Sequence, residues 1–386
     1  MLAGIRRLKW LNAADGLRRL LGAPSPRARS LSPERLATAL YHGILGREPD
    51  PPGLDEQIER LCSGEPLEQV INRFISSAEF HARFLRARLP AVQLPDLTAL
   101  MPERYETQMV EGRPMNVFLA VADSDIAVMA SLIEHHRFYD RFGVWTPVID
   151  LDKEIIAAIV RGLGARSCFE LGCFTGPVLS LLADAGLNVC GAEVSHLAFA
   201  YAYPNIRGAM MFGDLLSLGI DREFDAVLCM DVLEHLDPLR LDDYVAKSAS
   251  LLAPNGYLYL NAPMWGEDPV FGTVEQPYLQ EWGAIGDAAF WRHWPCDGGG
   301  WPLHGHLVWA SPGWWTQKLA SHGLVRDLTI ERVIHRQLGG FFAQARGRRS
   351  LFVLRRPANS NAPEAVAAQL DKALAGVPDI PDRPTR

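Results

Sequence analysis

Two periods of apolar residues alternate along the chain between residues 167 and 260. Short apolar runs of strand length each end in a glycine or an acidic residue. Segments with apolar residues every three or four positions separate these runs, and a similar helical pattern at 152–163 precedes the first one. Strands that alternate with helices predict an α/β fold with a parallel, doubly wound sheet. In such a sheet, ligands bind outside the carboxyl ends of the strands.

The stretch 167–193 predicts a strand, a glycine turn, a helix and a second strand. Glu170 lies just before the turn, Gly172 and Gly176 lie within it, and Glu193 ends the second strand. A strand that meets a helix N-terminus through glycines is typical of nucleotide-binding crossovers, because free backbone N–H groups can approach the ligand closely. By itself, each glycine could equally serve the turn, and Glu193 could be a solvated cap.

Acidic residues recur at the ends of the predicted strands. The strands at 209–212 and 224–230 are followed by further carboxylates, which completes the set Glu170, Glu193, Asp214 and Asp231. A nucleoside with an aliphatic amino-acid arm would explain this set. One carboxylate accepts both ribose hydroxyls, one holds an ammonium group and one accepts from an adenine amine. No basic residue near the turn indicates phosphates, so S-adenosylmethionine fits the pattern better than a dinucleotide.

The motifs FELGCFTG, GAEVS, FGDLL, FDAVLCMDVLEHL and LLAPNGYLYL resemble, in this order, those of class I S-adenosylmethionine-dependent methyltransferases. HGHLVWASPGWWTQKLASHGL resembles the segment before the last two strands in the branch that carries V-L-E-H, so the resemblance covers about residues 150–356. It implies a Rossmann-like sheet with a last antiparallel strand, methyltransferase activity and S-adenosylmethionine as cofactor. The cofactor contacts that it implies are Glu170, Gly172 and Gly176 at the methionine arm, Glu193 at the ribose, Asp214 and Leu215 at the adenine, and Asp231 near the methionine end. Phe174 departs from the family, which has a glycine there, so its side chain must point away from the cofactor or narrow the site.

Three histidines are candidates for the base that a hydroxyl acceptor needs, because imidazole titrates near neutral pH. His235 follows the fourth strand at the expected edge, although it could instead hold the start of a helix. His304 and His306 flank Gly305, and alternation along an extended segment would place both on one side, as bases, substrate ligands or metal ligands. A metal ion needs a third ligand that the sequence does not identify, so we predict no metal site.

Proline-rich segments divide the remainder of the chain. We expect a basic segment and linker at 1–30, a small helical domain at 31–90, a linker and helical cap at 91–149, the methyltransferase domain at 150–356 and a mobile tail at 357–386. Within the methyltransferase domain, a Trp-rich insertion at 263–311 is expected to form a lid or pocket wall, and the last strands are expected at 324–333 and 351–354. The segment LYHGILGREPDPPGLDEQIERLCSGEPLEQVINRFISSAEF resembles a small bacterial helical domain of unknown function, which implies no chemistry. Its Asp50 is interpreted as a helix N-cap and not as a calcium ligand.

Composition narrows the partners. The net charge of −7 disfavours nucleic acid. The six cysteines form no C-x-x-C pair and so give no metal framework, and Cys168, Cys190 and Cys229 lie in apolar runs, which suits a reducing compartment. No membrane span or signal peptide is predicted, so we expect a cytoplasmic protein. Residues 1–24 could contact a membrane surface weakly or form a solvated docking helix. The tryptophans concentrated between 263 and 315 either pack in the core or offer flat faces to a sugar ring.

We therefore predict a methyltransferase that acts, by in-line transfer, on an oxygen of a saccharide or of another small or cell-surface biosynthetic acceptor. The saccharide follows only from the association with the helical domain. The alternative is a non-catalytic cofactor-binding or scaffold protein on the same fold, which Phe174 and the helical domain motivate. A nicotinamide oxidoreductase is disfavoured because G-x-G-x-x-G is missing and V-L-E-H is present. The oligomeric state is not predicted.

Overall fold

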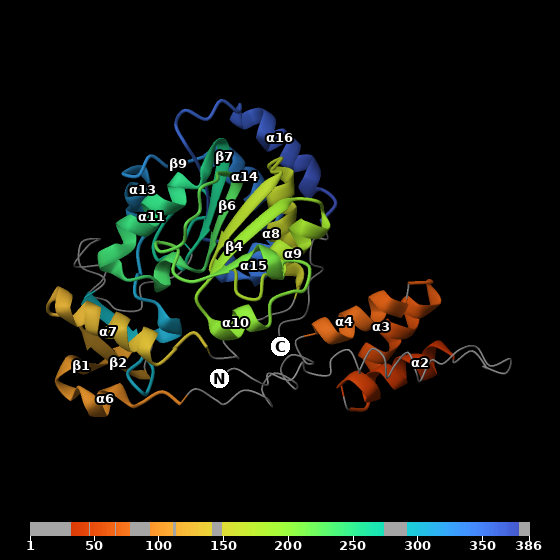
Figure 1. Ribbon diagram of the computed structural model, residues 1–386, viewed down its shortest axis with the longest axis horizontal. Helices are drawn as coiled ribbons and strands as arrows, with labels where there is room; N and C mark the ends of the chain where they lie inside the picture. Colours follow the sequence, from red (N-terminus) through yellow and green to blue (C-terminus); the bar gives the residue numbers. More distant parts are fainter. Residues whose placement is uncertain are drawn as a thin grey trace, which may run out of the picture. The chain divides into compact units, whose positions relative to one another are not determined.

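The computed structural model describes residues 32–45, 47–65, 67–77, 93–110, 113–140, 149–273 and 292–377. They belong to two units that divide between residues 83 and 84 (Figure 1). The predictions for residues 1–24 and for the middle of the Trp-rich insertion lie outside the described residues. Among the helices that are described, none has the length and apolar character needed to cross a bilayer.

The first unit is helical. It contains α2 (Pro33–Leu40), a π-helical turn (Tyr41–Leu45), α3 (Pro51–Cys62) and α4 (Leu67–Ser76) around a small apolar core. Asp50 is the N-cap of α3, and its Oδ1 accepts a hydrogen bond from the Gly53 N–H at 3.0 Å. This confirms the N-cap interpretation of Asp50.

The second unit is built on a seven-stranded sheet in the order β5-β4-β3-β6-β7-β10-β9. Its strands are β3 (Ser167–Leu171), β4 (Asn188–Glu193), β5 (Met210–Phe212), β6 (Phe224–Met230), β7 (Leu252–Asn261), β9 (Val325–Arg326) and β10 (Leu351–Arg355). Strands β3 to β7 are parallel, whereas β10 runs antiparallel to β7 and β9. The predicted fold class, with its last antiparallel strand, is confirmed.

Helices cover both faces of this sheet (Figure 1). They are α8 (Leu151–Gly162), α9 (Pro177–Asp184), α10 (His196–Ala200), α11 (Leu241–Ser250), α13 (Pro312–Ala320), α14 (Leu328–Gln337), α15 (Gly339–Gln344) and α16 (Pro363–Leu374). Successive strand residues point to opposite faces. Phe169 therefore joins the core under α11 and α13, and its neighbour Cys168 joins the core under α8, α9, α14 and α16. Both faces are buried, which explains the continuous apolar runs of the strands.

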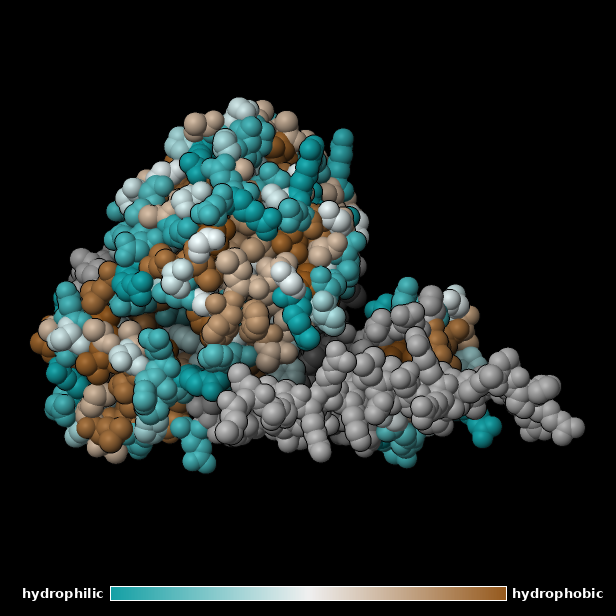
Figure 2. Space-filling model, viewed as in Figure 1, coloured by the Kyte–Doolittle hydropathy of each residue, from teal (hydrophilic) through white to brown (hydrophobic). Residues whose placement is uncertain are grey.

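A three-stranded antiparallel sheet forms a separate lobe of the same unit (Figure 1). It comprises β1 (Tyr105–Val110), β2 (Arg113–Leu119) and β8 (His293–Cys296), with α7 (Asp123–His135) and the short α6 (Leu97–Leu100) beside it. Trp294 and Trp301 are fully buried in its core against Phe118 and Met129. Figure 2 shows apolar residues gathered on the outside of this lobe, where Met109 is among the exposed ones.

Several local predictions were wrong. Residues 115–119, which lie in the segment expected to be a linker and helical cap, belong to β2. Most of 324–333 is α14, because Ile330, Val333 and Ile334 are buried at helical spacing. The tail predicted to be mobile contains α16, whose Leu370 is fully buried; a Cβ at Gly162 of α8 would meet its Cδ1 at 2.5 Å.

The described part of the Trp-rich insertion, which was expected to form a lid or pocket wall, adds β8 to the small lobe and contributes Pro263, His304 and His306 to the wall of a cavity described below. It crosses to the small lobe as β8 and returns to the main sheet. Of its tryptophans, Trp294, Trp301 and Trp309 are buried, as is Trp315 in α13, which confirms the interpretation of these residues as core.

Candidate active site

A cavity of about 370 Å³ lies at the carboxyl ends of β3, β4 and β6, where the strand order changes direction. Its volume is within the range of about 300–1,000 Å³ that is usual for small-molecule sites. Five of the residues predicted from the sequence line it, namely Glu170, Gly172, Glu193, Asp231 and His235. We call it the cofactor cavity. Three of the four acidic strand ends therefore meet at one site.

Gly176, Asp214 and Leu215 lie outside the lining of the cofactor cavity. Gly176 has φ 75°, and a Cβ there would meet Ile206 Cδ1 at 2.5 Å, so packing and backbone conformation explain this glycine. Leu215 is buried in the core. Asp214 Oδ1 accepts a hydrogen bond from the Leu216 N–H at 3.0 Å. Contacts of these three residues with an adenosyl group stay predictions.

Glu193 is held by the glycine turn itself. Its Oε2 accepts a hydrogen bond from the Phe174 N–H at 2.7 Å, and its Oε1 accepts one from the Ser195 N–H at 2.7 Å. Phe174 has φ 51°, a left-handed conformation that favours glycine, and it lies in the wall of the cavity. The backbone at this position therefore has a conformation that favours glycine, although it carries a phenyl ring that lines the cavity.

Glu170 has a free oxygen in the cofactor cavity. It is buried, and no residue in the described part of the chain donates a hydrogen bond to its Oε2. Burial and the nearby Glu193 carboxylate together raise the pKa of Glu170 to about 8, against the opposing effect of Lys153. An ammonium group would satisfy this carboxylate, so the residue fits the methionine arm of S-adenosylmethionine.

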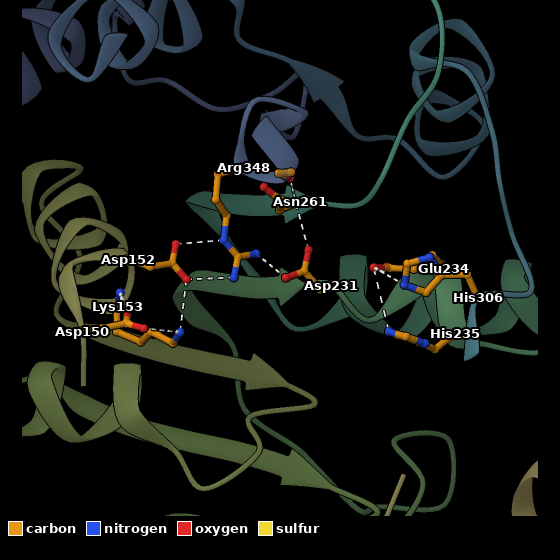
Figure 3. A network of polar contacts seen from close by, with 10 residues as sticks. Asp150, Asp152, Lys153, Asp231, Glu234, His235, Asn261, His306 and Arg348 are labelled. Carbon is orange, nitrogen blue, oxygen red and sulfur yellow. Dashed lines mark hydrogen bonds and ion pairs between the residues drawn. The ribbon is translucent and has the colours of Figure 1, made fainter. Parts of the chain in front are cut away.

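Four residues that line the cofactor cavity, Asp152, Lys153, Asp231 and Arg348, form a network of charged groups (Figure 3). Arg348 donates from Nε and Nη2 to the Asp152 carboxylate at 2.8 Å each, and from Nη1 to Asp231. Asn261 Nδ2 donates to Asp231 Oδ1 at 2.9 Å, and Lys153 Nζ lies 3.3 Å from Asp152. The two aspartates raise the pKa of Arg348, so it stays charged.

Lys153 and Arg348 were not predicted as site residues from the sequence. Lys153 lies in the first turn of α8, and Arg348 follows α15. No motif marks either position, because the pairing joins Asp152 and Arg348, which are 196 residues apart.

A second cavity of about 370 Å³ adjoins the first. We call it the acceptor cavity. It is lined by Asp231, Glu234, Pro263, His304, His306, Ala345, Gly347 and Arg348. Asp231 and Arg348 line both cavities, so these two side chains form the boundary between them.

The predicted histidines lie close to one another, with His235 in the lining of the cofactor cavity and His304 and His306 in that of the acceptor cavity. The ring centroids of His235 and His306 are 4.7 Å apart, and those of His304 and His306 are 5.4 Å apart. His304 and Gly305 have φ 57° and 79°, so a turn brings the rings together and the expected extended segment is wrong. Burial lowers the pKa of His235 to about 4, and that of His306 well below its usual value. Both rings are therefore neutral near pH 7.

This strand order, with a cofactor cavity at the ends of β3, β4 and β6, is that of class I S-adenosylmethionine-dependent methyltransferases. Residues 169–260 match the family model described as a methyltransferase domain. Residues 26–84 match a domain of unknown function, DUF4214. The chain thus contains a methyltransferase domain, whose class uses S-adenosylmethionine, and both resemblances found in the sequence are confirmed.

Curated relatives are similar over part of the chain. The ubiquinone biosynthesis O-methyltransferase of Aromatoleum aromaticum is 27% identical over 136 residues, which are 33% of this chain and 57% of the relative. The protein of the same name from Albidiferax ferrireducens is 23% identical over 168 residues, 41% of this chain and 65% of the relative. The matched segment therefore spans about three fifths of the length of these relatives.

Solved structures are also similar to parts of the chain. The amino pentose methyltransferase CalS10 from Micromonospora echinaspora, with bound S-adenosylmethionine, is 19% identical, with a TM-score of 0.37, over 58% of this chain and 96% of that one. The sugar N-methyltransferase KedS8 from a Streptoalloteichus species is 27% identical, with a TM-score of 0.27, over 30% of this chain and 50% of that one.

Proposed function

We propose that this protein is an S-adenosylmethionine-dependent methyltransferase that methylates a hydroxyl oxygen of a small acceptor. Glu170 would bind the ammonium group of the cofactor and Glu193 its ribose. The observation that carries the proposal is the shared wall of the two cavities. Asp231 and Arg348 line both, so a donor in one cavity and an acceptor in the other would meet beside them.

Methyl transfer to a hydroxyl is an in-line displacement that needs positioning and one proton transfer. The acceptor oxygen bonds to the methyl carbon while the carbon–sulfur bond breaks and sulfur keeps the electron pair. The hydroxyl proton must leave, and we assign its acceptor as His304. This residue lines the acceptor cavity and is exposed, so its ring can pass the proton to solvent. The side chains of His235 and His306 are only 9% and 8% exposed.

Oxygen as the methylated atom is supported by the curated relatives, which are named O-methyltransferases. Saccharides and phenols are the two classes of acceptor to be tested. Burial of Trp294, Trp301 and Trp309 removes flat faces that could have stacked on a sugar ring, so tryptophan stacking does not favour the saccharide.

The test incubates the full chain with methyl-labelled S-adenosylmethionine and two acceptor panels, one of saccharides and one of phenols. We expect the label on an oxygen of an acceptor from one of the panels. In His304→Gln this labelling should be lost, while the affinity for S-adenosylhomocysteine, measured by calorimetry, stays unchanged. Absence of S-adenosylhomocysteine binding would refute the proposal. Binding without transfer to either panel, or to bacterial extracts, would establish the non-catalytic alternative. Label on nitrogen would contradict the assignment to oxygen.

A further inference from the structure

Glu234, His235 and His306 form a cluster that the proposed methyl transfer does not use. Glu234 and His235 lie in the 3-10 turn after β6, and His306 directly follows another such turn at Leu303–Gly305. Glu234 Oε1 is 3.9 Å from His235 Nε2 and 4.0 Å from His306 Nε2 (Figure 3). One ligand atom from each residue lies within 4.8 Å of the others.

The cluster has an unsatisfied carboxylate at its centre. Glu234 is fully buried, and within the described ranges neither of its oxygens accepts a hydrogen bond. Distances of 3.9 and 4.0 Å are too long for hydrogen bonds to the imidazoles. A buried carboxyl without a partner holds a proton, whereas buried carboxylates are normally paired, hydrogen-bonded or bound to metal, so a bound cation would satisfy Glu234.

The surrounding backbone holds the cluster in place. The N–H groups of Leu307 and Val308 donate to the Glu234 carbonyl oxygen at 2.7 and 2.9 Å. His235 Nδ1 donates to the Gly305 carbonyl oxygen at 3.2 Å, and Tyr139 Oη donates to the same oxygen at 3.0 Å. Because the neutral ring carries its one proton on Nδ1, His235 Nε2 has none, and this nitrogen faces Glu234. A backbone carbonyl on the second ring nitrogen is how metal-bound histidines are usually oriented.

We propose that Glu234, His235 and His306 bind a divalent transition-metal ion, with zinc as the first candidate. Two imidazoles and one carboxylate are a donor set of zinc sites that keep an open position. Zinc–ligand distances of about 2.1 Å in tetrahedral geometry separate neighbouring ligand atoms by about 3.4 Å. The two separations from Glu234 Oε1 would each have to shorten by about 0.5 Å, and the separation between the two histidine ligand atoms, which is at most 4.8 Å, by up to about 1.4 Å. Rotation of the three side chains would supply these changes. The sequence prediction of no metal site considered His304 and His306, for which no third ligand was identified, whereas this cluster joins His306 to Glu234 and His235.

The fourth coordination position of the ion, which has no protein ligand, would face the acceptor cavity, because Glu234 and His306 both line that cavity. An ion there would bind the acceptor hydroxyl and lower its pKa, so that the oxygen reaches the methyl group already partly ionised. His304 would take the released proton. This role rests on the proposed function, whereas the binding of the ion does not.

The test measures metal binding apart from catalysis. Chelator-treated full-length protein is titrated with Zn²⁺ by calorimetry and with Co²⁺ by visible absorption. We expect the wild type to bind one equivalent of metal ion. The affinity for the ion should fall at least about tenfold in Glu234→Gln and in His306→Gln. His322→Gln is the matched control. His322 lies 2.7 Å from Asp242 on the protein surface, and its loss should leave the equivalent unchanged.

Melting curves and S-adenosylhomocysteine affinity show whether each variant is folded. X-ray absorption of the zinc-loaded wild type, which needs no variant, should report two imidazole ligands. A wild type that binds no equivalent, a folded Glu234→Gln with unchanged affinity, or a spectrum without imidazole would overturn the inference. If S-adenosylhomocysteine binding and methyl transfer persist in such a case, the metal site fails and the proposed function stands. If instead the protein binds the metal ion but transfers no methyl group, the proposed function fails and the metal site stands.

Discussion

Glu170→Gln is predicted to abolish the pH dependence of S-adenosylhomocysteine binding. This ligand carries the amino-acid arm whose ammonium group we assign to Glu170. Burial and the Glu193 carboxylate raise the pKa of Glu170 to about 8, against the opposing effect of Lys153. The free protein therefore holds a proton on Glu170 at neutral pH, and a cationic ligand must displace that proton to form an ion pair.

The size of the effect follows from this pKa. About one tenth of the Glu170 side chains are ionised at pH 7 and about one hundredth at pH 6. If only the ionised form binds the ammonium group, affinity rises about tenfold from pH 6 to pH 7, which corresponds to about 1.4 kcal/mol. The rise should flatten above pH 8, where most of the side chains are already ionised.

The assay is calorimetry from pH 6 to pH 8.5 in two buffers with different ionisation enthalpies, which counts the protons released on binding. Wild type should release nearly one proton below pH 7, and Glu170→Gln none. Glu331→Gln is the matched control, because Glu331 is a buried carboxyl with a pKa raised by burial to about 7, outside the cofactor cavity. An affinity that changes less than about threefold from pH 6 to pH 7 in the wild type, without proton release, would refute the reasoning.

Three further predictions concern the same site. Gly172→Ala should destabilise the protein by about 2–5 kcal/mol in urea unfolding, because φ is 62° and the added Cβ would meet Val232 Cγ2 at 2.6 Å. Gly208→Ala, where nothing lies within 4 Å, should have little effect. His304→Gln should slow methyl transfer by about 10²–10⁴-fold in single-turnover assays. Glu170→Gln should raise the melting temperature at pH 8.5 but not at pH 5. The native pKa of about 8 exceeds the unfolded value of 4.5, so wild-type stability falls as pH rises between them, by up to about 5 kcal/mol. An equal shift at both pH values would contradict this assignment.

The sequence by itself determined the main sheet and part of the cofactor cavity. Apolar runs and the acidic residues that end them are local features, and parallel strands bring their carboxyl ends to one edge of the sheet. Glu170, Glu193 and Asp231 could therefore be placed together without knowledge of side-chain packing. At 324–333 the predicted strand was wrong, because a short apolar stretch fits a strand and a buried helix equally well.

Only the tertiary structure decided what surrounds those carboxylates. Arg348 reaches Asp231 across 117 positions of sequence, and His306 comes to within 4.0 Å of Glu234 because its segment returns from the small lobe. Such pairings depend on how loops pack over the sheet, which residue spacing does not encode. The pKa values of Glu170 and His235 also had to come from the fold, because burial causes their shifts.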